Sequence, residues 1–433
     1  MTVFALATPP GRGAIAVIRL SGSSVSETLA ALGATALRPR VAHLRVLVHG
    51  AQRLDEALVL WFPGPASFTG EDCAELHLHG GRAVVEGVTR ALLDLGLRPA
   101  EPGEFARRAF SNGRMDLAQA EAVADLIDAE SRAQAEQALG QLGGALSAVY
   151  TGFRRDLLTA LALVEAEIDF PDEDVPDHLA RQAGPVLDGL AARLSSALAD
   201  GQRGERVRAG YRIVLIGETN AGKSSLFNAL TAREAAIVTP IAGTTRDVLD
   251  AELVIGGYAV TLSDTAGLRD SDDPIEMEGV RRARARAQAA DLRVWVRGPG
   301  EAASAAEAFM RTGDLVVLTK CDLGAGVAPP ALDCLAVSTA TGEGLADLVS
   351  RLRKRLEQDL SGGDFPAVTR ERHRRRLTEA LVAVEAGRAA LDVAPEMAAE
   401  DLRHAASALA RVTGEIGVED VLGEVFSTFC IGK

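Results

Sequence analysis

A glycine-rich segment near the middle of the chain has the residue spacing of a phosphate-binding loop. Gly217 and Gly222 are followed directly by Lys223 and Ser224, and an apolar run precedes the first glycine. Backbone N–H groups of such a loop, where it begins a helix, point at phosphate oxygens. Lys223 would add a positive charge at the β- and γ-phosphates, and the Ser224 hydroxyl is a ligand for Mg²⁺. An ordinary glycine-rich turn needs neither residue, so the spacing predicts a nucleoside triphosphate site.

Three further segments follow in the order that a GTP site needs. Thr245 offers a second hydroxyl for Mg²⁺, and Asp264 can hold the metal through water from the end of a predicted strand. The backbone N–H of Gly267 can face the γ-phosphate. Asp322, after the apolar run Leu315–Leu318, can accept from both the ring N–H and the amino group of guanine, whereas adenine would leave that carboxylate unpaired.

The guanine segment departs from the usual GTPase pattern at two positions. Thr319 replaces the more common asparagine before Lys320, and Thr339 stands between Ser338 and Ala340 where alanine is usual. Both are small changes, and Asp322 keeps its place, so we expect guanine to remain the base.

The residues expected to cleave GTP also differ from those of Ras-like proteins. Leu268 occupies the position at which those proteins have a glutamine that orients the attacking water. The segment 269–278 that follows is rich in carboxylates. It is either a solvated acidic loop or the source of a carboxylate that reaches back to the nucleotide and takes part in hydrolysis. Asn220 lies where its side-chain oxygen could bind a monovalent cation beside the phosphates, with backbone carbonyls from Thr239–Gly243 completing the shell.

The pattern of apolar residues predicts the elements that must position these groups. Residues 1–115 alternate as strands, for example Ala14–Leu20, with Pro/Gly turns between them. Residues 116–205 show helical spacing, 206–356 alternate short strands with helices as in a parallel sheet, and 365–433 return to alanine-rich helices. We therefore expect an N-terminal α+β domain, an all-α helical domain in two halves, and a P-loop α/β domain inserted between those halves.

Composition excludes several classes of protein. No apolar run approaches the roughly 20 residues that span a bilayer, and the N-terminus lacks the features of a signal peptide, so we expect a cytoplasmic protein. The net charge of −14 disfavours RNA binding over the whole surface and leaves only local contact or contact through a partner. Only four of the 46 cations are lysine: Lys223, Lys320, Lys354 and Lys433. Lysines retained in an arginine-rich chain suggest places that need a compact ammonium.

Over its full length the sequence resembles the tRNA-modification GTPase family known as MnmE or TrmE. The motifs that support the resemblance are Ala7–Gly13, Phe62–Pro65, Ser67–Asp72, Pro102–Phe105, Asp116–Ala122, Ile168–Glu173, Asn220–Ser225, Ile241–Asp247 and Phe429–Lys433. The C-terminal motif and the divided helical domain distinguish this family from other Era-like GTPases.

The resemblance implies a subunit that hydrolyses GTP within a tRNA-modifying complex. Its N-terminal domain would bind 5,10-methylene- or 5-formyl-tetrahydrofolate and form a homodimer. With the FAD-containing flavoprotein MnmG (GidA), the complex would install a (carboxymethyl)aminomethyl group at C5 of the wobble uridine. K⁺-dependent dimerisation of the inserted domains would drive hydrolysis, and tRNA would bind mainly through the partner.

The resemblance also implies roles for individual residues. Asn220, Thr239, Ile241 and Thr244 match the K⁺ contacts, Ser224 and Thr245 the Mg²⁺ ligands, Glu276 the general base acting through water, and Cys430 the essential C-terminal cysteine. Arg19, Glu75, Arg114 and Lys433 match the folate-binding positions; Arg114 is a lysine in some relatives, and either residue supplies positive charge. From the residues alone, Cys430 is better explained as a buried apolar side chain than as a functional thiol.

The motifs and the resemblance together predict the full set of residues that contact GTP. These are Asn220, Ala221, Gly222, Lys223, Ser224, Ser225, Thr239, Ile241, Ala242, Gly243, Thr244, Thr245, Asp264, Thr265, Ala266, Gly267, Thr319, Lys320, Asp322, Ser338, Thr339 and Ala340.

Two other functions stay open at this point. The chain could be a regulatory switch such as an Era-like ribosome-assembly GTPase, or a folate-dependent transferase on which the GTPase is incidental. The switch hypothesis leaves Arg19 and the Phe429–Lys433 terminus unexplained.

Overall fold

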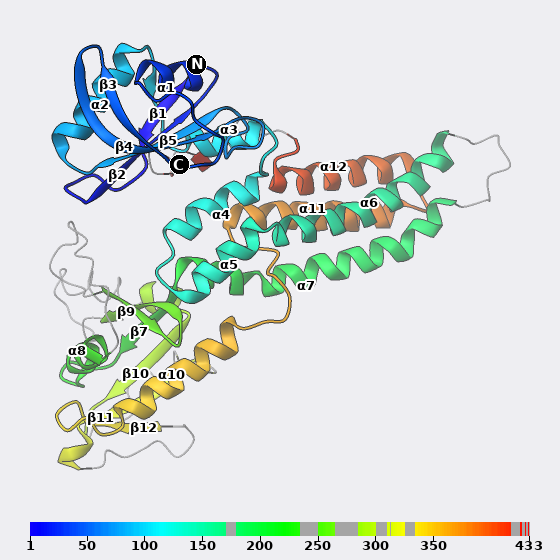
Figure 1. Cartoon of the computed structure of the whole chain (residues 1–433). Coiled ribbons are helices and arrows are strands. Elements are labelled where there is room, and N and C mark those ends of the chain that lie inside the picture. Colours follow the sequence, from blue (N-terminus) through cyan, green and yellow to red (C-terminus); the bar gives the residue numbers. More distant parts are fainter. Residues whose placement is uncertain are drawn as a thin grey trace, which may run out of the picture. The chain divides into compact units, whose positions relative to one another are not determined.

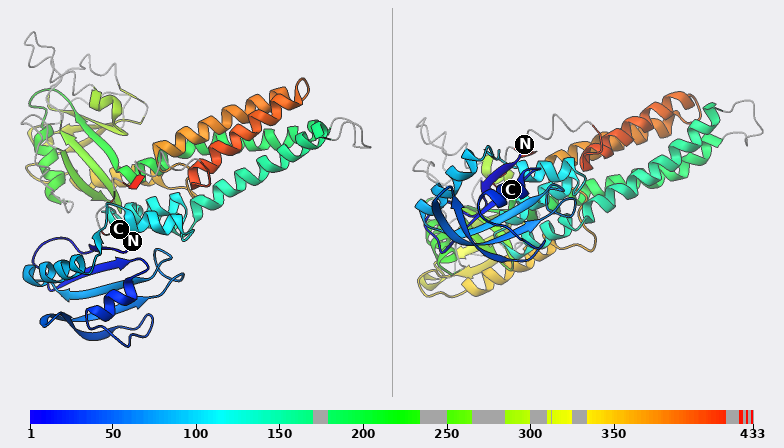
Figure 2. Two further views of the ribbon diagram at one scale, coloured as in Figure 1. Left: turned by 90° about the horizontal axis from the view of Figure 1, so that it is seen from above. Right: turned by 45° about the horizontal axis from the view of Figure 1, so that its top comes forward.

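The computed structural model describes most of the chain, and its contacts divide the chain into two compact units. The described residues are 1–169, 179–233, 250–264, 285–299, 310–311, 313–324, 334–416, 425–426, 429 and 432. The first unit consists of Met1–Ala124, Gln141–Ala191 and Arg376–Lys433, and the second of Asp125–Gly140 and Ala192–Arg375. Figures 1 and 2 show the elements of both. The domain boundaries given above remain a prediction.

The N-terminal part of the first unit is a six-stranded sheet with the strand order β3-β4-β5-β2-β1-β6. Its strands are β1 (Val3–Leu6), β2 (Ile15–Ser21), β3 (His43–His49), β4 (Gln52–Phe62), β5 (Cys73–His79) and β6 (Arg98–Pro99). Its helices are α1 (Val25–Ala31), α2 (Arg82–Asp94) and α3 (Glu104–Ser111). Ile18 and Leu20 of β2 lie in the buried core. Because side chains alternate along a strand, Arg19 lies on the opposite face of the sheet.

The helices that follow are mostly long. They are α4 (Leu117–Ile127), α5 (Arg132–Leu142), α6 (Ala145–Asp169), a 3₁₀ turn (Leu179–Ala183), α7 (Gly184–Ala209), α11 (Glu371–Ala390) and α12 (Pro395–Thr413). In the first unit α12 packs along α6 (Figures 1 and 2). Proline at its first turn and Gly414 in the left-handed conformation, at φ 85°, set the ends of α12. None of the described helices is long and apolar enough to cross a membrane.

The second unit contains the P-loop domain. Its six-stranded sheet has the order β12-β11-β10-β7-β9-β8, and every neighbouring pair except β8 and β9 is parallel. The strands are β7 (Tyr211–Ile216), β8 (Asp250–Ile255), β9 (Tyr258–Asp264), β10 (Leu292–Arg297), β11 (Leu315–Thr319) and β12 (Cys334–Val337). Among the described residues of this domain, the helices are α8 (Lys223–Arg233), α10 (Leu345–Leu360) and the 3₁₀ turn η3 (Cys321–Leu323).

Helix α10 shows how the pattern of apolar residues builds this core. Its buried leucines, at helical spacing, are Leu345, Leu348, Leu352, Leu356 and Leu360. They belong to the same apolar cluster as the strand residues Ile213 and Leu215. The predicted fold class is therefore confirmed, with an N-terminal α+β part, a helical part and an inserted P-loop domain with a mostly parallel sheet.

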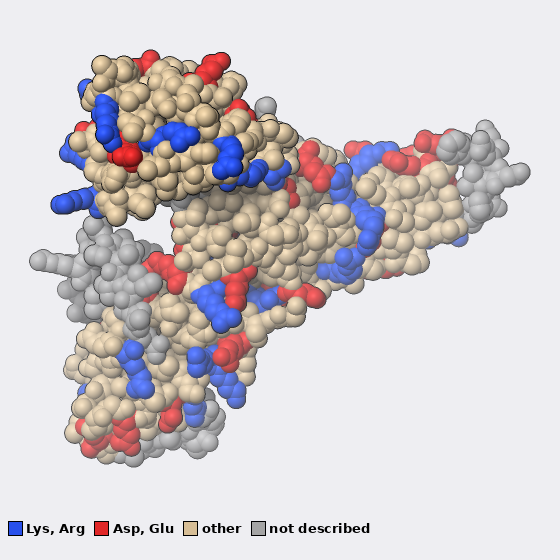
Figure 3. Space-filling model, in the orientation of Figure 1, with Lys and Arg blue, Asp and Glu red and all other residues tan. Residues whose placement is uncertain are grey.

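Charged side chains on one face of the structure are mixed in sign. On the face shown in Figure 3, arginine and lysine side chains lie beside aspartate and glutamate rather than in one continuous basic area. Short ion pairs account for part of this mixing, such as Arg374 with Glu205 at 2.6 Å and Arg388 with Asp188 at 2.9 Å.

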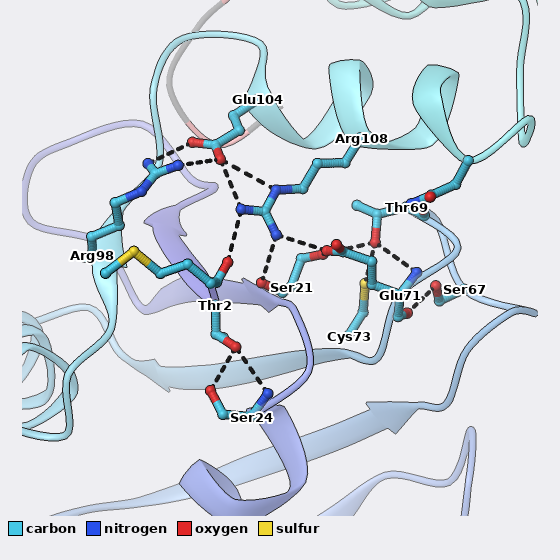
Figure 4. Close-up of polar contacts among 12 residues, drawn as sticks. Thr2, Ser21, Ser24, Ser67, Thr69, Glu71, Cys73, Arg98, Glu104 and Arg108 are labelled. Atoms are coloured by element: carbon cyan, nitrogen blue, oxygen red, sulfur yellow. Dashed lines mark hydrogen bonds and ion pairs between the residues drawn. The ribbon is translucent and has the colours of Figure 1, made fainter.

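A buried carboxylate organises the N-terminal domain. Glu104, at the start of α3, has a side chain only 2% exposed and accepts hydrogen bonds from Arg98 at 2.6 and 2.8 Å and from Arg108 at 2.8 Å (Figure 4). Arg108 also donates to Glu71 at 2.7 Å. Glu71 in turn accepts from Ser21 of β2 at 2.8 Å. These contacts join α3, β2 and the Ser67–Asp72 segment in one network.

We expect Glu104→Gln to destabilise the N-terminal domain at neutral pH by about 3 kcal/mol. Burial raises the pKa of Glu104, but hydrogen bonds from Arg98, the Glu101 N–H and Arg108 outweigh it and lower the pKa from 4.5 to about 2. The stabilisation is therefore complete above the unfolded-state pKa and is lost as the pH falls towards 2. The measurement is urea unfolding followed by Trp61 fluorescence, in a Trp295→Phe background that removes the other tryptophan.

The matched control is Glu101→Gln, because Glu101 is a neighbouring carboxylate whose side chain is 65% exposed. It should leave the unfolding midpoint nearly unchanged. An unaltered midpoint and unaltered acid dependence in Glu104→Gln would contradict the prediction.

Candidate functional site

The phosphate loop lies at the carboxyl end of the central strand β7. This strand is bonded in parallel to β9 on one side and β10 on the other, so the loop begins where three neighbouring strands end together. A Cβ atom on Gly217 would lie 2.2 Å from the carbonyl oxygen of Val296, and Gly222 has a φ of +94°. Only glycine fits either position, which explains the two glycines of the motif.

Lys223 and Ser224 are the first two residues of α8, which follows this loop directly. Lys223 is 7% exposed, and its Nζ donates to the carbonyl oxygens of Gly217 at 3.1 Å and Glu218 at 2.7 Å. The ammonium thus lies against the loop whose N–H groups would bind phosphate. At this position it can neutralise phosphate charge.

The arrangement of Ser224 and Asp264 fits a hydrated Mg²⁺ ion. Ser224 Oγ donates to Asp264 Oδ2 at 2.6 Å, and Asp264 is 8% exposed. The other carboxylate oxygen, Oδ1, is buried and has no hydrogen-bond partner among the described residues. A buried acceptor without a partner is costly, and Mg²⁺ with its waters binds oxygen ligands of this kind.

The residues predicted to surround guanine follow the ends of β11 and β12, the next strands in the sheet. Thr319 is the last residue of β11, Lys320 follows it, and Asp322 lies exposed in η3. Ser338, fully buried, accepts from the N–H of Thr341 at 3.1 Å and so orders the loop after β12. The carboxyl ends of the strands therefore bring three groups to one edge of the sheet. These are the described parts of the phosphate loop, the Ser224–Asp264 pair and the segment predicted to bind guanine.

Several predicted residues lie outside the described residues. These are Thr239, Ile241, Ala242, Gly243, Thr244, Thr245, Thr265, Ala266, Gly267, Glu276, Cys430 and Lys433. Their assignments stay predictions.

A second cluster of polar side chains lies on the N-terminal sheet. Arg19 of β2 and Glu75 of β5 are register partners, and the guanidinium donates to Glu75 Oε1 at 2.9 and 3.2 Å. The Arg19 guanidinium also lies over two aromatic rings, 5.4 Å from the centroid of Phe68 and 5.9 Å from that of Phe105. Cation–π contact on this scale helps to fix the guanidinium in place.

His77 is part of this cluster and was not predicted to be. Its Nε2 lies 3.2 Å from Glu75 Oε2, so both carboxylate oxygens have partners. Burial raises the pKa of Glu75, but hydrogen bonds from His77 and Arg19 outweigh it, and the pKa lies below the ordinary value. Glu75 is therefore ionised at neutral pH. The two-residue spacing of Glu75 and His77 on one strand face was the available signal.

Two further contacts join Arg114 to the Ser67–Asp72 segment and Gly432 to β1. A Cβ on Gly70 would lie 3.3 Å from Cγ of Arg114, so the exposed Arg114 packs against Gly70 in the Ser67–Asp72 segment that also contains Phe68. Near the C-terminus, a Cβ on Gly432 would lie 2.7 Å from the carbonyl oxygen of Leu6. Leu6 belongs to β1, in which the preceding Ala5 pairs with Arg19.

Comparisons with known proteins agree with this architecture. Residues 2–114 match the family model described as GTP-binding protein TrmE N-terminus, and residues 117–430 match the model of the MnmE helical domain.

Curated relatives match the whole chain. A tRNA modification GTPase MnmE from Caulobacter vibrioides is 53% identical over 443 residues, covering 100% of this chain and 99% of the relative. Proteins of the same name from Phenylobacterium zucineum and Maricaulis maris are 53% and 51% identical, again over 100% of this chain and 99% of each relative. The chain therefore belongs to the tRNA modification GTPase MnmE family and is a GTP hydrolase that takes part in tRNA modification.

Proposed function

We propose that this chain is the GTP-hydrolysing subunit of a complex that installs a (carboxymethyl)aminomethyl group at C5 of the wobble uridine. The complex would use a one-carbon tetrahydrofolate and the FAD-containing flavoprotein MnmG (GidA). The observation that carries the proposal is a second group of polar side chains, separate in sequence from the GTP site, in which Arg19 pairs with Glu75 and both Arg19 and Arg114 lie against the Ser67–Asp72 segment. A GTPase that acts only as a switch has no need of such a site.

The chemistry of these side chains suits a folate. The ligand has a glutamate tail, which needs cations, and a pterin whose N–H groups need an acceptor. Arg19 is held in place by Glu75 and two aromatic rings, and Glu75 is an ionised acceptor, so both are arranged before a ligand binds. Bound folate would supply the one-carbon unit, and glycine or ammonium would supply the amine. Lys433 would add a further cation from the C-terminus.

The positions of Phe429 and Gly432, the described residues on either side of Cys430, support a role for Cys430 at the N-terminal domain. Phe426 and Phe429 pack with Ala106 and Leu117 in a buried cluster beside α3 and α4. Gly432 contacts β1 next to the strand that contains Arg19. The chain thus returns to the N-terminal domain on both sides of Cys430, and we assign the thiol a catalytic role there.

The outer face of the N-terminal sheet supports a homodimer. Ile15, Leu44, Leu58 and Val46 are 61%, 56%, 44% and 40% exposed, and Leu44 and Leu58 are neighbours across β3 and β4. Exposed apolar side chains grouped on one surface are typical of protein–protein contact. A second copy of the chain is the occupant that the family resemblance implies. We propose that tRNA binds mainly through the flavoprotein, because the net charge of −14 disfavours RNA binding over this chain's own surface.

For hydrolysis we propose that Glu276 is the general base acting through water and that K⁺ completes the phosphate site. Asn220 fits such a role because it is an exposed amide within the phosphate loop, with a φ of 67° that asparagine tolerates. Thr239, Ile241 and Thr244 would provide the remaining contacts, with Ser224 and Thr245 on Mg²⁺. A cation there would offset the charge that develops between the phosphates during hydrolysis.

Deleting the gene should abolish the modification at wobble uridine C5. The measurement is mass-spectrometric nucleoside analysis of total tRNA from the deletion strain, with the same strain expressing the intact chain as the control. A strain expressing Lys223→Ala should resemble the deletion, because that ammonium contacts the phosphate loop. Fully modified wobble uridines in the deletion strain would overturn the proposal. If that strain also showed a ribosome-assembly defect, the result would favour a regulatory switch.

GTP turnover should be faster in K⁺ than in Na⁺ by roughly tenfold or more at high protein concentration. Leu268 has no polar group that could orient the attacking water. Hydrolysis should therefore depend on a K⁺ ion that offsets the charge developing between the phosphates. Steady-state hydrolysis is measured in both salts at matched ionic strength. Asn220→Gly is the informative variant because glycine keeps the positive φ and removes only the amide. It should lose the difference between the salts, whereas equal rates in the native chain would exclude the K⁺ site.

A further inference from the structure

The residue that ends β11 contacts the phosphate loop directly. Thr319 is 4% exposed, and its Oγ1 donates to the carbonyl oxygen of Ala221 in the loop. The carbonyl oxygen of Arg297, at the end of β10, lies 3.0 Å from the same hydroxyl. Ala221 and Thr319 are 98 residues apart in the sequence, so this contact exists only in the folded domain.

A hydroxyl group can donate only one hydrogen at a time, and both neighbours of Thr319 Oγ1 are acceptors. Donation to a purine nitrogen would therefore remove the bond to the phosphate loop. Asparagine, the more common residue at this position, has two N–H donors and an acceptor and can contact a loop and a base together. Threonine must do one or the other.

The packing around the Thr319 hydroxyl favours donation to the phosphate loop over donation to the base. A Cβ atom on Gly222 would lie 3.0 Å from Thr319 Oγ1, so the loop backbone rests against this side chain. Lys320, in the left-handed conformation with φ 56°, donates from Nζ to the carbonyl oxygen of Asn220 at 2.8 Å. Two successive carbonyls of the loop, those of Asn220 and Ala221, are thus bonded by the two successive residues Thr319 and Lys320.

We propose that Thr319 is a positioning residue that fixes the phosphate loop through the Ala221 carbonyl and does not recognise guanine. Recognition of the base is left to Asp322 and the loop after β12. The guanine N7 atom, an acceptor on the purine edge, then accepts no hydrogen bond from Thr319. This inference rests on the GTPase activity of the family and not on the folate or wobble-uridine chemistry, so it stands or falls independently of those.

The test compares how two diphosphates bind to the full chain. GDP and 7-deaza-GDP differ only in that the second lacks the N7 acceptor, and their dissociation constants are measured by isothermal titration calorimetry in the presence of Mg²⁺. Thr319→Val removes the hydroxyl at nearly constant volume, and Thr319→Ser keeps it. Thr159→Val is the matched control, since Thr159 also donates to a backbone carbonyl but lies in α6.

Thr319→Val should weaken both ligands by about tenfold, because the buried carbonyl of Ala221 loses its donor. The ratio of the two dissociation constants should be the same in the native chain and in the variant. Thr319→Ser should recover affinity to within about threefold of the native chain, and Thr159→Val should have no effect on binding.

Two results would overturn the proposal. One is native affinity for GDP in Thr319→Val, which would mean that the hydroxyl does not position the loop. The other is a preference of the native chain for GDP over 7-deaza-GDP that disappears in Thr319→Val, which would show that Thr319 recognises N7. If Thr319→Val fails to fold, the same comparison with Thr319→Ser and Thr319→Asn decides, since asparagine should introduce a preference for GDP and serine should not.

Discussion

The nucleotide site depends on how closely the phosphate loop packs against the ends of its neighbouring strands. Gly217 lies against the carbonyl of Val296 at the end of β10, and Gly222 lies against Thr319 at the end of β11. Neither position has room for a side chain. Because β7, β10 and β11 are parallel and adjacent, their carboxyl ends form one edge, and the loop is confined by that edge. Lys223 and the Ser224–Asp264 pair are placed by the same constraint.

The N-terminal domain is organised by a different interaction, the pairing of arginines with buried carboxylates. Glu104 holds Arg98 and Arg108, and Arg108 extends the network to Glu71. Glu71 lies in the Ser67–Asp72 segment, whose Phe68 contacts the guanidinium of Arg19. A planar guanidinium can bind a carboxylate through two parallel N–H donors in a fixed fork, a geometry that a lysine ammonium lacks. The arginine-rich composition of the chain thus has a structural use in this domain, whereas Lys223 and Lys320 each contact backbone carbonyls of the phosphate loop.

The parts of the structure that could be predicted from sequence are those encoded locally. The phosphate loop is a run of a few residues between a strand and a helix, and the leucines of α10 repeat at helical spacing, so both are visible without a fold. The strand around Ala14–Leu20 was likewise predicted by alternation, and β2 confirms it. What could not be predicted is contact between distant segments. Arg19 meets Glu75 because β2 pairs with β5 in one register, and Thr319 meets Ala221 because β11 lies beside β10. No local pattern in the sequence specifies either pairing.

The β8–β9 hairpin contacts the nucleotide site at one end and α5, which precedes the P-loop domain in the sequence, at the other. Asp264 at the end of β9 bonds to Ser224, and at the other end of the hairpin the carbonyl of Gly257 accepts from the N–H of Ala133 in α5 at 3.0 Å. Helix α5 is held in turn by Gln134, whose side chain donates to the carbonyl of Arg208 in α7 at 3.1 Å. The register between β8 and β9 is unbroken from the pair Asp250 and Ser263 to the pair Ile255 and Tyr258, so the hairpin is continuous between these two contacts. The same hairpin therefore contacts both Ser224 at the nucleotide site and α5, a helix that the sequence places far from the phosphate loop.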